Sequence, residues 1–262
     1  MRIGINSMAV TEFGDGVVSA QEVKLIELSL AEFDFINNGY NVVSKAIELK
    51  NNYGIEYTIH APFQDAKSIR IDLTERDEKN FKVMKHVFEI CNKLEAGYVV
   101  VHGGDVRSHH YIENLVNNLR VICKMASEYG IIIALENLFT NEIGIRRAGE
   151  TPQELLQIVE DVGMDNLGVT IDVGHAYITA QQYGFNIKEY FDMLKDYIVH
   201  MHVHNNIGLK NEPWDKHLPI TVGEINYNEI PIKADNVILE VKRGNRDEVL
   251  KSLEFLKKFN II

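Results

Sequence analysis

The 262-residue sequence is poor in cysteine, in basic residues and in long apolar runs. Two cysteines are too few for the disulfide framework of a small secreted domain. No apolar run approaches the roughly 18 residues of a membrane span, and the N-terminus, MRIGINSMAV, lacks a signal-peptide pattern. Cys91 and Cys123 fall on apolar faces of predicted helices. We therefore expect reduced thiols and a cytoplasmic protein that does not enter a membrane.

Basic residues are outnumbered, since 27 lysines and arginines stand against 38 aspartates and glutamates, for a formal net charge of −11. An acidic surface repels nucleic acid and anionic membranes, so the charge disfavours a nucleic-acid partner and predicts no membrane partner. Bound divalent cations would offset part of this charge locally. The composition leaves the oligomeric state open.

The sequence predicts eight strands, most of them followed by a helix. The predicted strands are residues 2–7, 32–36, 55–60, 98–102, 131–136, 167–172, 198–205 and 236–241. The spacing of apolar residues predicts helices that include 20–29, 41–53, 174–197 and 246–259. Strands as apolar as YVVVH and IIIALE are buried on both faces, as in a parallel sheet. Eight such units predict an α/β protein, a single-domain (β/α)8 TIM barrel over residues 1–262, with an open doubly wound sheet as the alternative.

Histidine is concentrated in the stretch IVHMHVHNNIGLKNEPWDKH, at residues 198–217. It contains His200, His202 and His204 in alternation, then Asp215 and His217. In a strand, alternation places three imidazoles on one side. Imidazole and carboxylate together suit zinc, manganese or iron. A single histidine of this kind is better explained as a hydrogen-bonded core residue, but the density of the cluster favours a metal site.

Metal-capable side chains also recur at the carboxyl ends of the predicted strands. From the third strand to the eighth they are His60, His102, Glu136, Asp172, His202 and Glu240. In a barrel these ends meet at one mouth, which is where barrel active sites lie. Carboxylates buried there are costly unless each is paired or bound to a metal. Strand parity also points Lys242 inward, above Glu240, and predicts that His200 lies in a lower layer of the barrel.

Seven segments in order resemble the xylose isomerase-like barrel superfamily, which includes sugar isomerases, epimerases and endonuclease IV. They are YTIHAPF at 57–63, VVVHGGD at 99–105, ALEN at 134–137, IDVGHAY at 171–177, HVHNN at 202–206, DKH at 215–217 and ILEV at 238–241. The resemblance extends over nearly the whole chain.

The resemblance implies a set of metal ligands. The metal site common to the superfamily matches Glu136, Asp172, His202 and Glu240. Endonuclease IV holds three zinc ions, and its additional ligands match His60 and His102 for one ion and His175, Asp215 and His217 for another. All nine positions are filled, so we expect one to three divalent ions, Zn²⁺ or Mn²⁺.

Two enzymatic functions are compatible with these residues. As an isomerase or epimerase of a small sugar or sugar phosphate, the protein would pass through an enediolate stabilised by the metal, with Glu136 and Glu240 exchanging the proton. Lys242, His204 and Arg147 are the predicted substrate contacts. As an endonuclease IV-like phosphodiesterase, it would use clustered zinc ions to cleave DNA at abasic sites.

The sequence favours the isomerase or epimerase. The net charge is negative, and the loop FQDAKSIRID after His60 offers only Lys67 and Arg70 to DNA. The G-E-G segment expected of a nuclease is incomplete, because Gly223-Glu224 is followed by isoleucine. A third possibility is a non-catalytic binder of metal or sugar, although simple binding does not require the paired glutamates.

Overall fold

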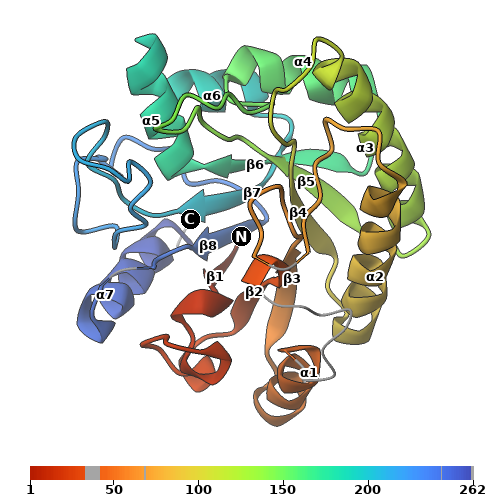
Figure 1. The fold of residues 1–262 in the computed structure, drawn as a ribbon. Coiled ribbons are helices and arrows are strands. Elements are labelled where there is room, and N and C mark those ends of the chain that lie inside the picture. Colours follow the sequence, from red (N-terminus) through yellow and green to blue (C-terminus); the bar gives the residue numbers. More distant parts are fainter. Residues whose placement is uncertain (33–41, 68, 243, 261–262) are drawn as a thin grey trace.

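Eight parallel strands close into a barrel in which each strand pairs with its sequence neighbour and β8 pairs with β1 (Figure 1). This computed structural model describes residues 1–32, 42–67, 69–242 and 244–260. The strands are β1 Arg2–Asn6, β2 Leu25–Ser29, β3 Glu56–His60, β4 Tyr98–His102, β5 Ile132–Glu136, β6 Leu167–Asp172, β7 Ile198–Val203 and β8 Asn236–Leu239. Closure confirms the predicted TIM barrel and excludes the open doubly wound sheet.

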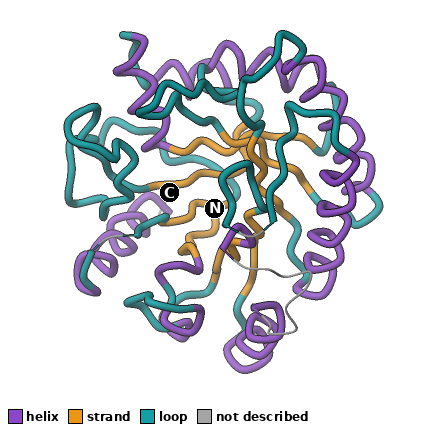
Figure 2. The backbone as a smooth tube through the Cα atoms, in the orientation of Figure 1, coloured by secondary structure: helices purple, strands orange, loops and turns teal. Residues whose placement is uncertain are grey.

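Helices surround the barrel on its outer side (Figure 2). They are α1 Val42–Tyr53, α2 Glu78–Leu94, α3 Tyr111–Ser127, α4 Pro152–Val162, α5 Val173–Tyr183, α6 Lys188–Leu194 and α7 Arg246–Lys257. Thr151 caps α4 by accepting a hydrogen bond from the Glu154 N–H, and Pro152 takes the first helical position, where its missing N–H costs no hydrogen bond. In the part of the chain that the structure describes, no helix is long and apolar enough to cross a membrane.

Alternation along the strands separates the hydrophobic core from the site. In β4, Val99 and Val101 join the core between barrel and helices, while His102 ends the strand at the mouth. Parallel register then places His102 beside Glu136 and Asp172 beside His202. The strand ends therefore bring polar residues from distant parts of the sequence to one level of the barrel.

The predicted helix at 20–29 is wrong. Residues 20–22 form a short 3-10 helix, and β2 follows, paired along its whole length with β3. All five residues of β2 are buried, and so short an apolar run fits helical and extended spacing equally well. The predicted strand at 32–36 is also displaced, because Glu32 ends a 3-10 helix. Residues 33–36 lie outside the described part of the chain.

Smaller differences lie near the mouth. The segment predicted as one helix at 174–197 is two helices, α5 and α6, separated where Gly184 adopts the left-handed conformation (φ 75°) that ends α5. β8 ends at Leu239, so Glu240 stands just beyond the strand. Residues 204–235, all described, form no helix, which agrees with the irregular segment in the sequence. The domain extent of 1–262 stays a prediction.

Candidate metal centre

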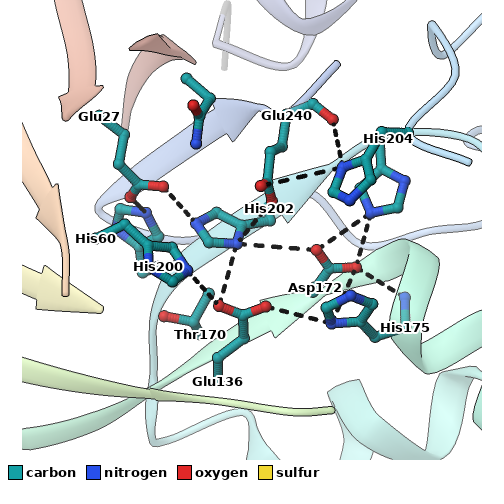
Figure 3. Close-up of polar contacts among 12 residues, drawn as sticks. Glu27, His60, Glu136, Thr170, Asp172, His175, His200, His202, His204 and Glu240 are labelled. Atoms are coloured by element: carbon teal, nitrogen blue, oxygen red, sulfur yellow. Dashed lines mark hydrogen bonds and ion pairs between the residues drawn. The ribbon is translucent and has the colours of Figure 1, made fainter. Parts of the chain in front are cut away.

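The mouth of the barrel brings the nine predicted metal ligands into one connected cluster, most of which Figure 3 shows. His60, His102, Glu136 and Asp172 end β3, β4, β5 and β6, His202 lies in β7, Glu240 follows β8, His175 lies in the first turn of α5, and Asp215 and His217 lie in the loop before β8. The strand ends, the first turn of α5 and the loop before β8 thus bring these side chains together at the mouth.

Glu136 is the centre of the cluster. Its Oε2 lies 3.2 Å from His60 Nε2, 3.3 Å from His102 Nε2 and 3.4 Å from His202 Nδ1. Its Oε1 lies 3.2 Å from His175 Nδ1. The side chain is 1% exposed, so these imidazoles take the place of water around a buried carboxylate.

In the four-residue metal site that the resemblance implies, His202 Nδ1 is the atom that the other three residues approach. It lies 3.3 Å from Glu240 Oε2 and 3.8 Å from Asp172 Oδ2, in addition to its contact with Glu136. Ligand atoms of Asp172, His202 and Glu240 all fall within 4.8 Å of one another. Carboxylates from three other strand ends therefore approach one nitrogen of His202 to within 3.8 Å.

A second group of ligands lies beside the first. Asp215 Oδ2 is 2.7 Å from His217 Nε2 and 3.5 Å from His175 Nε2. His204 joins this group, with Nε2 3.1 Å from Asp172 Oδ1 and 3.7 Å from Asp215 Oδ1. His204 thus connects the two groups, because it contacts Asp172 in the first group and Asp215 in the second.

Backbone carbonyls orient several of these rings. The Nδ1 atoms of His60, His175 and His217 lie 2.9, 3.0 and 2.9 Å from the carbonyl oxygens of Ala61, Asn137 and Glu240. A proton on Nδ1 would be donated to the carbonyl and would leave Nε2 of each ring free toward the cluster. Metal-binding histidines commonly donate their second ring N–H to a backbone carbonyl in this way.

Asn137 and Gly174 shape the turn that carries Asp172. The Asn137 side chain accepts from the Asp172 N–H at 2.7 Å and donates to the Asp172 carbonyl at 3.1 Å. Asp172 in turn caps α5 by accepting from the His175 N–H at 2.7 Å. At Gly174, an added Cβ would lie 2.0 Å from His204 Cε1. This close approach explains the glycine in IDVGHAY.

The histidines keep the buried carboxylates ionised. Burial alone would raise the pKa of Glu136, but the charges of His102 and His202 hold this pKa well below its usual range. Burial would likewise raise the pKa of Asp172, but the imidazoles of His175 and His204 lower this pKa to about 2. The pKa of Glu240 is also lowered against the effect of burial, first by His217 and His202. The protein atoms thus supply anionic oxygen ligands near neutral pH.

The donor set fits a divalent metal ion. Five groups of three carboxylate or imidazole residues bring ligand atoms within 4.8 Å of one another, and nitrogen and oxygen ligands of this kind suit zinc or manganese. His202 Nδ1, His102 Nδ1 and Asp215 Oδ1 are buried without an aligned hydrogen-bond partner among the described residues. Unpartnered buried polar atoms are costly, and a metal would satisfy those that face the cluster.

A cavity of about 150 Å³ opens beside the cluster. Its lining includes Phe63, Phe139, Arg147 and Lys242 together with His60, His102, Glu136, His175, Asp215, His217 and Glu240. Lys242 Nζ lies 2.8 Å from His217 Nε2. Arg147 pairs with Asp65 and lies 3.6 Å from an Asp105 oxygen. Two of the three predicted substrate contacts therefore reach the cavity.

His204 and His200 lie away from that cavity. His204 has no exposed surface and contacts the carboxylates of Asp172 and Asp215, so its role in binding substrate stays a prediction. His200 is fully buried in the barrel, with Nε2 2.9 Å from Glu27 Oε2.

Glu27 was missed by the sequence reasoning. Its carboxylate is fully buried under the cluster, with Oε1 2.8 Å from His202 Nε2 (Figure 3). The incorrect helix at 20–29 hid its position inside the barrel. The feature of the sequence that could have identified Glu27 is its place as a single acidic residue in the middle of the apolar run LIELS.

Comparisons with known proteins agree with the fold. The sequence profile of the xylose isomerase-like TIM barrel family matches residues 25–259. The protein MJ1311 of Methanocaldococcus jannaschii is 30% identical to this chain, over 99% of the chain and 89% of the relative. A crystal structure of a D-tagatose 3-epimerase-like protein is 28% identical, with a TM-score of 0.75 over 99% of this chain and 97% of that chain.

A further solved structure, the IOLI protein with a bound zinc atom, has a TM-score of 0.71 at 17% identity, over 100% of this chain and 97% of that chain. At this identity the likeness concerns the fold. The family match, by contrast, includes seven of the eight strands and all of the proposed ligands. The chain therefore belongs to the xylose isomerase-like TIM barrel family.

Proposed function

We propose that this protein is a metal-dependent isomerase or epimerase of a small sugar or sugar phosphate. The observation that carries the proposal is the pair Glu136 and Glu240. Their carboxylates approach His202 Nδ1 from different sides of the barrel mouth, at 3.4 and 3.3 Å, and both line the cavity. The similar structure named as a D-tagatose 3-epimerase-like protein supports a sugar as the substrate.

Glu136, Asp172, His202 and Glu240 would hold the catalytic metal. The zinc atom bound by the IOLI protein, which has the same fold, supports an ion in this barrel. When bound, a divalent ion would act as a Lewis acid and stabilise negative charge on a substrate oxygen. The protein would position the substrate carbon between the two carboxylates, since both line the cavity.

Glu136 and Glu240 would move the proton. The neighbouring histidines lower the pKa of both carboxylates. Both are therefore ionised before the reaction and can accept a proton. One carboxylate removes a proton from the substrate carbon and becomes a carboxyl group. Return of that proton to the neighbouring carbon is isomerisation. For epimerisation, the second carboxylate would first take a proton from water and then donate it to the opposite face of the same carbon, while the first carboxyl group releases its proton to water.

The cavity suggests a small and mainly neutral substrate. Its volume of about 150 Å³ is below the usual range of about 300–1,000 Å³ for ligand pockets. Phe63 and Phe139 offer apolar faces, and Lys242 offers a cation for a hydroxyl or phosphate oxygen. Arg147 is already paired with Asp65, which reduces the charge available for a phosphate group.

A second candidate function is phosphodiester cleavage at abasic sites in DNA. It is favoured by the additional ligands, since His60 and His102 meet at Glu136 while His175 and His217 meet at Asp215. Clustered metals would serve such a reaction. The net charge of −11 opposes it, because DNA binding depends on neutralising phosphates.

The two functions are separated by one assay design. The protein, loaded with Zn²⁺ or Mn²⁺, is incubated in deuterated water with a panel of sugars and sugar phosphates, and in parallel with abasic-site DNA. We expect carbon-bound deuterium in at least one sugar and no DNA cleavage. DNA cleavage without deuterium incorporation would reverse the ranking, and neither activity would favour a binding protein.

Variants then test the paired glutamates. Glu136→Gln and Glu240→Gln should each abolish deuterium incorporation, whereas Glu89→Gln, a change on the exposed face of α2, should not. Metal content is measured for every variant, so that loss of the ion is distinguished from loss of the proton-transfer group.

A further inference from the structure

Glu27 is a buried carboxylate that the proposed reaction does not use. It lies in the centre of β2 and has no exposed surface. It does not line the cavity, so it cannot touch a substrate bound there. An ionised group at such a position is costly unless it is paired, so its partners indicate its purpose.

Both oxygens of Glu27 face partners inside the barrel. Oε1 lies 2.8 Å from His202 Nε2, and Oε2 lies 2.9 Å from His200 Nε2. The Thr58 hydroxyl on β3 donates to Oε2 at 3.3 Å. The hydrogen bond from Thr58 and the close contact with His200 hold one oxygen of the carboxylate, and the other oxygen lies against His202.

His202 stands between Glu27 and the proposed metal ligands (Figure 3). Its Nε2 side meets Glu27, whereas its Nδ1 side meets Glu136 and Glu240 at 3.4 and 3.3 Å. The Nε2 contact is short, although it is not aligned as a linear hydrogen bond. The two ring nitrogens therefore have separate environments.

We propose that Glu27 is a positioning residue that accepts the Nε2–H of His202 and so directs Nδ1 to the metal. The inference rests on the metal centre of the proposed function. A carboxylate that accepts the second ring N–H fixes the tautomer and orientation of a metal-bound histidine and makes it a stronger ligand. Glu27 acts through His202 and leaves the first set of ligands unchanged.

The same three residues allow a different arrangement. Ligand atoms of Glu27, His200 and His202 also lie within 4.8 Å of one another. If that trio held an ion itself, His202 would bind through Nε2. The nitrogen that carries the proton in the zinc-bound protein therefore decides between the two arrangements.

Two measurements test the proposal, and neither uses activity. Zinc affinity is measured by competition with a chelator, and long-range ¹H–¹⁵N spectra of the zinc-bound protein identify the protonated nitrogen of His202. We expect a proton on Nε2 and metal on Nδ1. Glu27→Met, an apolar change of similar size, should weaken zinc binding by about 10–100-fold, the usual effect of removing such a partner.

The matched control is Thr170→Val, which removes a buried hydroxyl inside the barrel that donates to the Ala134 carbonyl at 3.5 Å. It should keep wild-type zinc affinity. If Glu27→Met does not fold, Glu27→Gln takes its place, and the spectrum of the wild-type protein remains informative.

The outcomes separate two failures. If the wild-type protein binds no zinc, the metal centre of the proposed function is wrong. If it binds zinc but His202 binds through Nε2, or if the folded Glu27 variant binds zinc as tightly as wild type, only the role of Glu27 is overturned.

Discussion

At the scale of single residues, Gly174 shows how closely the candidate site is packed. An added Cβ would lie 2.0 Å from His204 Cε1 and 2.5 Å from its Nε2, and His204 is fully buried. Gly174→Ala should therefore displace the imidazole from Asp172 and destabilise the fold by about 1–3 kcal/mol, the usual cost of overpacking. Chemical denaturation measures the change in unfolding free energy.

Gly97→Ala is the control for that substitution. A Cβ at Gly97 would meet nothing within 4 Å, so unfolding free energy should change little. Equal effects of the two substitutions would contradict the packing argument.

Asp215 and His217 define whether the site holds more than one ion. Both lie in the loop before β8, and they contact each other at 2.7 Å, beside the ligands that surround His202. We expect Asp215→Ala and His217→Ala to remove a weaker zinc equivalent and to retain the tighter one. Elemental analysis and zinc titration give the stoichiometry.

His86→Ala serves as the comparison, because His86 is half exposed on α2 and pairs with Glu89, which is not one of the cluster residues. It should change no equivalent. A wild-type content of one equivalent or less, unaffected by the Asp215 and His217 changes, would remove the multinuclear site.

Strand parity predicted single residues well where the strand itself was identified. His102 and Glu136 end their strands side by side, as the apolar runs before them indicated. Asp215 and His217 were different, since no strand parity governs a loop. Their place in the histidine-rich stretch favoured a metal site, and the resemblance to a family assigned them to an additional ion. Glu27 was missed because residue parity has no meaning in a segment assigned to the wrong type of element.

At the scale of elements, the loop after β5 is held by a buried ionic network. Arg146 donates to Glu150 at 2.7 Å and to both oxygens of Glu154, at 2.9 and 3.0 Å. Glu150 is fully buried and Glu154 is 7% exposed. Phe139 and Arg147, which line the cavity, belong to the same loop. The network therefore links α4 to the mouth of the barrel.

Arg146→Met should destabilise the protein by about 1.5–3 kcal/mol, since it removes charged hydrogen bonds and leaves two buried carboxylates with fewer donors. The guanidinium is 39% exposed, so solvent limits the effect to the lower part of this range. Arg76→Met is the control, because its partner Glu113 is also exposed. Urea denaturation compares them. An equal loss in both variants would show that the network adds nothing.

β4 and β6 were easier to predict than β2, although β2 is buried along its whole length. β4 and β6 begin and end where their apolar runs do. In contrast, Leu25 to Ser29 carries a short apolar pattern that fits either period, and pairing with β3 decides it in favour of a strand. That pairing is a tertiary contact, which local spacing does not contain.

At the scale of the whole molecule, the number of predicted strands favoured a closed barrel and left an open doubly wound sheet as the alternative. Eight parallel strands in sequence order form a barrel with all carboxyl ends at one mouth, so the candidate site follows from topology once the strands are counted. The substrate does not follow in this way, because loops of irregular structure shape the cavity.

The barrel also concentrates negative charge at its centre. Glu27, Glu136 and Asp172 are buried at 0%, 1% and 0% exposure, and Glu240 is 7% exposed. Buried carboxylates repel one another unless cations separate them. A metal that binds only the folded protein would add stability by mass action.

Zinc binding should increase the unfolding free energy by a measurable amount. Free zinc at 100 times its dissociation constant should raise the unfolding free energy by about 2.7 kcal/mol, which corresponds to a rise of roughly 5–10 °C in Tm for a protein of this length. Thermal unfolding with zinc and with excess chelator measures the difference. Asp172→Asn removes an anionic ligand that contacts both His202 and His204, so it should reduce the response. If chelation leaves Tm unchanged in the wild-type protein, the cluster is stable through its histidines alone, and the metal centre is contradicted.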